Sequence, residues 1–408
     1  MTLIEKWLTM GLLCLSGSTI FWLPLFSDIF YIPMQNAFGF TKTQMGILLS
    51  TFGTASLLAY FPGGWLADLF LPRKLITIAL VITALAGFIF STLPSFEICL
   101  ILFLIWGICS AGILWSAMIK AARCWGSKED QGKTYGILEG GRSMSDVVST
   151  TILLAIFAYN SSSVDKAVSE IIVMISFYTL ILAFLVWRIM SDDISNIKER
   201  KKVTIDEIIY IIKLPVIWLI ALIILAVQAA MWGTLFFTPY ATEVYELGEV
   251  GGGAIGVGKY WVTPFAAIAA GFFADKIGPA KAILGFSIVM AIGFLIFAII
   301  PGAPELLTLL IMNVAALTAA VYALRGTYFS LLEESNVPLS ITGTATGVIS
   351  VIAYTPDIFM PTLGGIVLDN YPGAFGYQYL FLVIFFLSLI GLFAAYFIYR
   401  KLQRHKSR

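Results

Sequence analysis

Three charged residues stand on one face of a long apolar stretch in the first half of the chain. Glu139, Arg142 and Asp146 follow one another at steps of three and four residues, so they line one side of a helix. Counted from Lys133, where this stretch begins, Arg142 lies roughly 13 Å and Asp146 roughly 20 Å along the helix axis. Such an arginine can meet an anionic substrate while a carboxylate beside it carries a proton. An ion pair that closes the helix bundle is the alternative, and both roles stay open.

Two further carboxylates fall within apolar runs, where an ionisable side chain without a partner is costly. Asp28 is a candidate for carrying a proton, with a fixed salt bridge to Lys259 or a contact with a helix N-terminus as the alternative. Asp357 stands between Pro356 and Pro361. Prolines free backbone carbonyl groups that need polar surroundings, so this segment predicts a kinked helix beside a polar space.

Two sets of candidate residues follow from these patterns. The substrate-binding candidates are cations and aromatic side chains that can stack on a planar or sugar-like ligand: Arg142, Arg325, Lys259, Trp115, Trp232, Tyr328 and Tyr354. The proton-coupling candidates are the carboxylates Asp28, Asp146, Asp357 and Glu139. Ordinary helix packing is the alternative for each aromatic residue. Lys120 lies near enough to the surface for its ammonium group to reach water.

These residues require membrane-spanning helices to position them. A span needs about 20 apolar residues, and twelve such runs begin near Lys6, Thr43, Leu75, Ile98, Lys133, Ala167, Pro215, Gly251, Ala282, Glu305, Ile341 and Gly376. We predict an N-terminal six-helix bundle over residues 1–190 and a C-terminal six-helix bundle with a basic cytoplasmic tail over 215–408. A cytoplasmic linker over 191–214, partly an amphipathic helix, joins them.

Composition favours lipid as the solvent. Hydrophobic residues make up 59% of the 408 residues and charged residues 12%, whereas soluble domains have about 25% charged residues. The net charge of +1 does not favour nucleic acid as a partner. The single histidine, His405, lies in the basic tail, and the four cysteines lack metal-ligand spacing. We therefore predict no metal, no cofactor and no enzyme activity.

Loop charges predict the orientation. With the N-terminus inside, the outer loops hold only Lys42 and Lys166 of the 25 lysine and arginine residues, so the positive-inside rule places both termini in the cytoplasm. The interiors of the third, sixth, ninth and twelfth runs hold no ionisable residue. Those four helices are expected to face lipid, and the others to surround something polar.

The loop after the second run recurs in reduced form after the eighth. Asp68 in the first copy and Asp275 in the second lie 207 residues apart, about half the chain. A carboxylate there can accept hydrogen bonds from the N-terminus of a neighbouring helix. We predict a conformational latch rather than a binding site, made of Gly64, Asp68, Arg73, Lys74, Glu129, Asp130, Gly271, Asp275 and Lys281.

Both loop copies resemble the signature loop of the major facilitator superfamily, Gly-x-Leu-Ala-Asp-Arg-x-Gly-Arg-Arg/Lys. Leu69 and Leu71 replace the usual basic residue and second glycine in the first copy. The resemblance implies an all-α polytopic membrane protein with 12 transmembrane helices in two pseudo-symmetric six-helix bundles. Helices one, four, seven and ten would line a central cavity, and helices three, six, nine and twelve would face lipid.

The segment from Lys120 to Gly136 resembles the loop between spans four and five in the sugar-phosphate-permease-like and organic anion branch. The phosphate-binding arginines that the organophosphate exchangers carry in spans one and seven have no counterpart here, so their exchange chemistry is not carried over. The stretch around Gly140 and Gly141 also lacks the Gly-Pro-x-x-Gly-Gly pattern of the drug-proton antiporters.

The predicted function is secondary active transport across the cytoplasmic (inner) membrane by proton-coupled symport with alternating access. The predicted substrate is a small polar organic solute, an organic anion such as a sugar acid or a sugar-phosphate-like molecule. A proton-coupled exporter of an amphiphile, a drug or a metal chelate such as a siderophore is the alternative. The expected partners are this solute, a proton with sodium as the second candidate, and membrane lipid, with the chain acting as a monomer.

Overall fold

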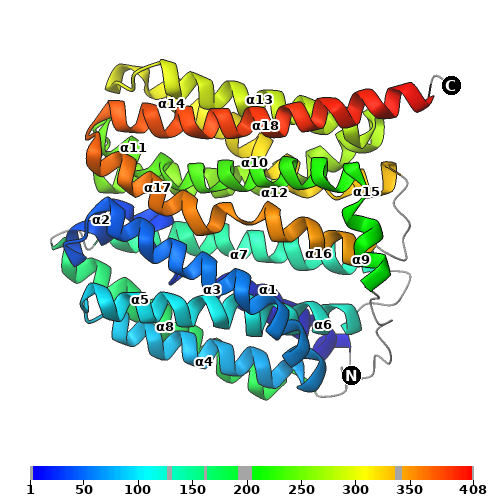
Figure 1. Cartoon of the computed structure of the whole chain (residues 1–408). Coiled ribbons are helices and arrows are strands. Elements are labelled where there is room, and N and C mark those ends of the chain that lie inside the picture. Colours follow the sequence, from blue (N-terminus) through cyan, green and yellow to red (C-terminus); the bar gives the residue numbers. More distant parts are fainter. Residues whose placement is uncertain (1–2, 126–130, 160–162, 192–204, 336–341, 407–408) are drawn as a thin grey trace. The chain divides into compact units, whose positions relative to one another are not determined.

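The computed structural model describes residues 3–125, 131–159, 163–191, 205–335 and 342–406. It divides the chain into two compact units, Met1–Glu199 and Arg200–Arg408, which we call unit 1 and unit 2. The boundary between them falls inside the linker predicted over residues 191–214. Within the described ranges the chain forms helices and turns, and no strand occurs there (Figure 1).

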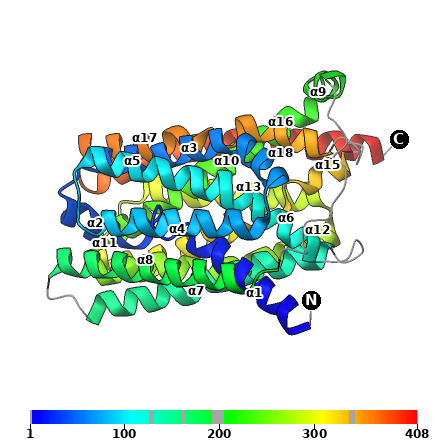
Figure 2. The same cartoon turned by 90° about the horizontal axis from the view of Figure 1, so that it is seen from below.

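Unit 1 is built from helices that run back and forth along one another. Its elements are α1 (Leu3–Thr19), α2 (Ser27–Phe38), α3 (Lys42–Leu69), α4 (Pro72–Phe90), α5 (Phe96–Gly107), the π-helix η1 (Ile108–Trp115), α6 (Ser116–Trp125), α7 (Gln131–Tyr159) and α8 (Val164–Ile189). α1 packs on α7 and α8, α4 packs on α8, and α3 packs on α5 and η1 (Figure 2).

Unit 2 repeats this plan after a short first helix. Its elements are α9 (Ile205–Ile212), α10 (Pro215–Leu235), α11 (Phe237–Glu243), α12 (Gly248–Ile277), α13 (Pro279–Ile299), the 3-10 turn η3 (Pro304–Leu306), α14 (Leu307–Thr327), α15 (Ser330–Glu334), α16 (Thr342–Ala353), α17 (Pro356–Asn370) and α18 (Ala374–Lys406). α18 packs on α13 and α10, α12 packs on α14, and α10 contacts α16 and α17.

The observed helices follow the predicted spans. Each of the predicted starts lies within one helical turn of the start of an observed helix. Within the described residues, 8 helical stretches are long and apolar enough to cross a membrane by length and composition. The twelve-span count and the cytoplasmic termini stay predictions. The short α9 falls on the part of the linker that was expected to be an amphipathic helix.

Two of the predicted spans are broken at prolines, and both breaks matter for the polar residues. In unit 1 the helix ends at Thr19 and resumes at Ser27, and Pro24 in the intervening turn has no N–H to donate. In unit 2 α16 ends at Ala353, and α17 begins at Pro356. The kink predicted at Pro356 is therefore present, and it makes Asp357 the second residue of a new helix.

Each unit has its own closely packed interior. In unit 1 a buried cluster joins α1, α4 and α6 through side chains such as Leu13, Ile76 and Met118. In unit 2 aromatic rings gather between α11, α13 and α18, where Tyr240 lies 5.6 Å from Phe297 between ring centroids. Side chains at helix seams are thus held by rigid surroundings.

Candidate functional site

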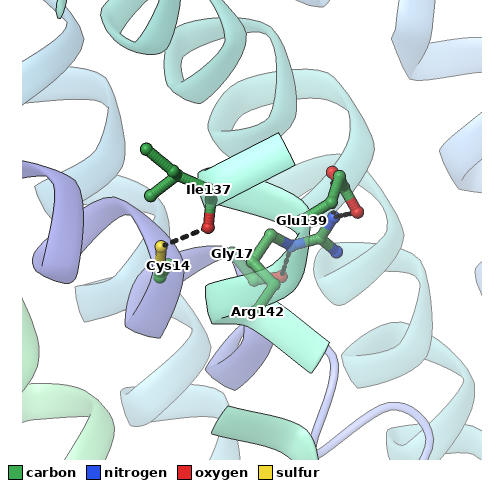
Figure 3. Close-up of polar contacts among 5 residues, drawn as sticks. All are labelled: Cys14, Gly17, Ile137, Glu139 and Arg142. Atoms are coloured by element: carbon green, nitrogen blue, oxygen red, sulfur yellow. Dashed lines mark hydrogen bonds and ion pairs between the residues drawn. The ribbon is translucent and has the colours of Figure 1, made fainter. Parts of the chain in front are cut away.

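Arg142 joins α7 to α1 in unit 1. Its Nη1 donates to both carboxylate oxygens of Glu139, at 2.8 and 2.9 Å, and its Nε donates to the carbonyl oxygen of Gly17 at 3.0 Å (Figure 3). Its guanidinium group also lies over the ring of Trp115, 4.8 Å from the centroid. The side chain of Arg142 is 13% exposed and that of Glu139 is 55% exposed. A carboxylate, a carbonyl and an aromatic face therefore compensate the arginine charge.

Two glycines let α1 and α7 approach closely enough for these contacts. A Cβ atom on Gly17 would lie 2.8 Å from Nε of Arg142 and would also overlap the sulfur of Met118. A Cβ on Gly141 would overlap the sulfur of Cys14, whose thiol faces the carbonyl oxygen of Ile137 at 3.7 Å (Figure 3). The position of Arg142 therefore depends on the small residues at the contact between α1 and α7, which we call the seam.

Asp146 lies one turn beyond Arg142 on the same seam. Its Oδ1 accepts hydrogen bonds from the hydroxyl group of Ser18 and from the indole Nε1 of Trp22, the latter at 3.0 Å. The indole ring stacks on Tyr178 of α8, with 5.4 Å between ring centroids. Asp146 is thus held by two donors from the first span, and its carboxylate is half-buried.

Asp357 in unit 2 is held in the same manner. Its Oδ1 accepts hydrogen bonds from Nε2 of Gln228 and from the indole Nε1 of Trp232, both at 2.7 Å and both from α10. It stands in the first turn of α17, where the partial positive charge of the helix N-terminus favours a carboxylate. The guanidinium group of Arg325 on α14 is near enough to interact with it electrostatically. Nη1 of Arg325 lies 3.1 Å from the sulfur of Met231.

The other charged candidates come from other helices. Lys259 is 3% exposed, and its Nζ donates to the carbonyl oxygen of Thr234 at 3.3 Å. Asp28 is buried in the first turn of α2. The Nζ of Lys120 donates to the carbonyl oxygen of Ala67 at 2.6 Å, and the side chain is half-buried.

The remaining aromatic candidates differ in their surroundings. Trp115 ends the π-helix η1 and lies against Arg142, so it belongs to the cluster in unit 1. Tyr328 is buried and packs edge-on against Phe329, with 4.7 Å between ring centroids. Tyr354 lies in the turn between α16 and α17 and is half-buried. Trp115 thus contacts Arg142 through its ring, and Trp232 contacts Asp357 through its indole N–H.

The predicted latch is only partly described. Glu129 and Asp130, together with the side chains of Asp68 and Asp275, lie outside the described residues, and the latch stays a prediction. The backbones of Gly64 and Gly271 lie within α3 and α12, and the side chains of Lys74 and Lys281 are exposed. Arg73 lies over the ring of Trp187 at 4.8 Å and donates to the carbonyl oxygen of Met190 at 3.4 Å.

The second loop copy makes a contact that the sequence analysis missed. Oε2 of Glu334 accepts a hydrogen bond from the backbone N–H of Ala280 at 2.8 Å, at the start of α13. Ser18 and Gln228 were missed as well, although their spacing contained a signal. Each stands four residues before a tryptophan, and the two pairs lie 210 positions apart.

Helical units that hold charged side chains at the seams of apolar helices are typical of polytopic membrane carriers. Residues 7–356 match the family model of the Major Facilitator Superfamily, and the chain belongs to this family. It is 27% identical over 388 residues to the inner membrane protein YqcE of Escherichia coli, covering 93% of this chain and 91% of that protein. It is 26% identical over 413 residues to the inner membrane protein YihN of the same organism, covering 98% and 97%.

Solved structures share the fold. A bacterial homologue of the human lysosomal transporter Spinster superposes with a TM-score of 0.79 at 13% identity, over 99% of this chain and 98% of that one. The nucleoside transporter NupG superposes with a TM-score of 0.74 at 15% identity, over 97% and 98%. Membership of the Major Facilitator Superfamily makes the chain a secondary transporter of a small molecule rather than an enzyme, and its relatives indicate a multi-pass protein of the inner membrane.

Proposed function

We propose that the chain transports a small polar organic anion together with a proton by symport. The observation that carries this proposal is the contact of Glu139 with Arg142. The arginine lies within α7, which we take to span the membrane, and its partner is a carboxylate that is 55% exposed. An exposed carboxylate can take up a proton or move away from the arginine, whereas the guanidinium group stays charged at all accessible pH values.

The pair couples proton uptake to anion binding. A proton on Glu139 removes its negative charge and weakens its hold on Arg142. The guanidinium group then needs another anion, because an uncompensated charge within the membrane is costly. A carboxylate or phosphate of the substrate fits that requirement, since it can accept two parallel N–H bonds from arginine. A proton on Glu139 and the negative charge of the substrate therefore enter the site together.

The other candidates support this exchange. Arg325 and Lys259 are cations within unit 2, and Asp28 is a buried carboxylate within unit 1. We take the proton rather than sodium as the coupling ion because the proposed exchange neutralises Glu139 by protonation. We further propose that the chain works as a monomer.

Transport into proteoliposomes tests the proposal. The purified chain should accumulate a labelled substrate from a panel of sugar acids and sugar phosphates when the side of substrate addition is acidic. Collapse of the pH difference with a protonophore should stop accumulation, whereas a sodium gradient should have no effect. Arg400→Gln is a matched control, because Arg400 lies on α18 near the aromatic ring of Tyr396, 6.0 Å from its centroid, and should leave transport unchanged.

A second candidate is proton-coupled export of an amphiphile, a drug or a metal chelate. It is favoured by the same ion pair, because Glu139 already balances Arg142 without a ligand. In that case an apolar or neutral probe should be moved against the proton flow. Accumulation of such a probe, with no response to sugar acids or sugar phosphates, contradicts the anion symport proposal.

A further inference from the structure

The two units repeat one arrangement that neither the fold nor the anion proposal requires. In each unit the first span donates two hydrogen bonds, one from an indole, to a single aspartate oxygen. Ser18 and Trp22 donate to Asp146 in unit 1. In unit 2 the donors to Asp357 are Gln228 and Trp232.

The repetition extends to register and spacing. Trp232 lies 210 positions after Trp22, and Asp357 lies 211 positions after Asp146. In both units the second donor stands one helical turn before the tryptophan. Its chemical type differs, a hydroxyl in one unit and an amide in the other, but both direct a hydrogen at the same carboxylate oxygen. The shared feature is therefore the orientation of the carboxylate.

The orientation leaves one oxygen of each carboxylate open. Within the described ranges, the hydrogen bonds that the side chains of Asp146 and Asp357 accept all end on Oδ1. Oδ2 of each is thus an acceptor without a donor among those residues, on a half-buried side chain. A carboxylate fixed by two donors at one oxygen is a pre-organised acceptor at the other.

We propose that Asp146 and Asp357 are hydroxyl-binding acceptors, so that the transported anion is polyhydroxylated. This inference rests on the proposed anion transport and specifies its substrate class. It assigns these two aspartates to substrate recognition and leaves proton coupling to Glu139. The indoles of Trp22 and Trp232, with Ser18 and Gln228, position the two carboxylates.

Nearby cations favour hydroxyl donors over amines. Arg142 lies one turn from Asp146, and Arg325 is near enough to Asp357 to interact with it electrostatically. A cationic group on the substrate would be repelled by either guanidinium, whereas a hydroxyl donor is neutral. The same arginines attract the substrate's own anionic group. Carboxylate acceptors beside a cation thus match a molecule that carries both hydroxyls and a negative charge.

Paired probes test the substrate class on the purified full-length chain. The pairs share one anionic group and differ in hydroxyls: gluconate with hexanoate, glucuronate with cyclohexanecarboxylate, and glucose 6-phosphate with hexyl phosphate. Binding raises the melting temperature by mass action. At least one hydroxylated probe should stabilise the protein, and its deoxygenated partner should need about a tenfold higher concentration or more for the same shift.

Amide variants test the two acceptors. In Asp146→Asn and Asp357→Asn the amide oxygen can still accept from the indole, but an N–H donor replaces the open oxygen. Each change should weaken binding of the hydroxylated probe about tenfold at every pH and leave the weak binding of its partner unchanged. A coupling carboxylate would behave differently, since its amide variant keeps affinity and exchange while it loses accumulation against a gradient.

Tryptophan variants test the positioning residues. Trp22→Phe and Trp232→Phe remove the indole donor and should weaken binding of the hydroxylated probe about threefold to tenfold. Trp106→Phe and Trp218→Phe are matched controls. Their indoles donate to backbone carbonyl oxygens, of Thr83 at 3.3 Å and of Ile212 at 2.7 Å. Both controls should keep the wild-type affinity even where they lower the melting temperature.

Three outcomes overturn the inference: equal stabilisation by both members of every pair, no stabilisation by any hydroxylated probe, or normal affinity in the two amide variants. Failure of the anion proposal has a different signature. Neutral glucose would then stabilise the wild-type protein as well as gluconate does, while the two amide variants would still lose binding.

Discussion

Unit 1 and unit 2 both hold an aspartate beside an indole, but their cations are arranged differently. In unit 1 Arg142 lies on the same helix as Asp146 and is bound by Glu139. In unit 2 the cation near Asp357 is Arg325, which comes from α14. The positions that lie 211 residues after Glu139 and Arg142 are Ser350 and Ala353. The second half of the chain therefore repeats the aspartate acceptor, but it holds uncharged residues at the positions that correspond to Glu139 and Arg142.

We interpret this difference as a division of roles between two features. One stays the same throughout the transport cycle, and the other changes its charge during the cycle. A feature that both units share, the oriented carboxylate, suits recognition of groups that every substrate molecule presents. A feature at positions that the repeat does not preserve, the exposed carboxylate on an arginine, suits a change of charge during the transport cycle. The following predictions alter one of the two features while leaving the other intact.

Arg142→Gln should have the largest effect. Loss of the guanidinium group removes the proposed anion contact, at a cost of about 2–5 kcal/mol in binding free energy. The protein should still fold, because Glu139 can take up a proton and become neutral. Equilibrium binding of gluconate or glucose 6-phosphate and the melting temperature should be measured together. Normal affinity with a lowered melting temperature would show that Arg142 is a structural ion pair.

Glu139→Gln should uncouple transport while sparing exchange. The amide imitates the protonated carboxyl group, so the substrate should still exchange across proteoliposome membranes. Accumulation driven by a pH difference should be lost. Glu170→Gln is the matched control, since Glu170 forms an exposed ion pair with Lys166 at 3.8 Å and pairs of that kind contribute little. Full accumulation by Glu139→Gln would assign coupling to another carboxylate.

Gly17→Ala should disturb the seam that is specific to unit 1. The added methyl group overlaps Met118 and lies 2.8 Å from Nε of Arg142, so stability should fall by about 1–3 kcal/mol. Affinity for the anion should fall as well, because Arg142 must move. Gly11→Ala on the same helix meets no atom within 4 Å. That control should leave affinity unchanged and can raise stability by up to about 1 kcal/mol through helix propensity.

Glu334→Gln should have the smallest effect. The carboxylate accepts from the backbone N–H of Ala280 at the start of α13, whose N-cap residue Gly278 offers no side-chain cap. Removal of the charge should lower stability by about 1 kcal/mol or less. The exposed Glu333→Gln serves as the control. Equal melting temperatures for the two variants would contradict a capping role for Glu334.

Much of the fold was predictable because it follows from apolar run length. A helix in lipid must satisfy its own backbone hydrogen bonds, so long apolar runs leave little choice of structure. Polar residues in those runs mark helix seams, and Arg142, Asp146 and Asp357 were all candidates before their contacts were known. The kink at Pro356 was predictable for the same local reason, since proline lacks an N–H.

The partners of these residues were harder to predict. Which side chain faces Asp146 depends on how α1 packs on α7, and that packing is set by small residues such as Gly17 and Gly141. Ser18 and Gln228 differ in chemistry, so a search for identical residues in the two halves does not pair them. Glu334 contacts a backbone N–H at a position 54 residues away in sequence. No sequence pattern fixes such a contact.

The pH dependence of anion affinity tests the central claim most directly. If Glu139 must be protonated before Arg142 accepts the substrate, affinity falls as the pH rises, by about tenfold per pH unit where Glu139 is ionised. Calorimetric titration of the purified protein with the best hydroxylated anion, at several pH values, should show that slope. In Glu139→Gln the affinity should be tight and independent of pH. The same slope in the wild type and in Glu139→Gln would contradict the account.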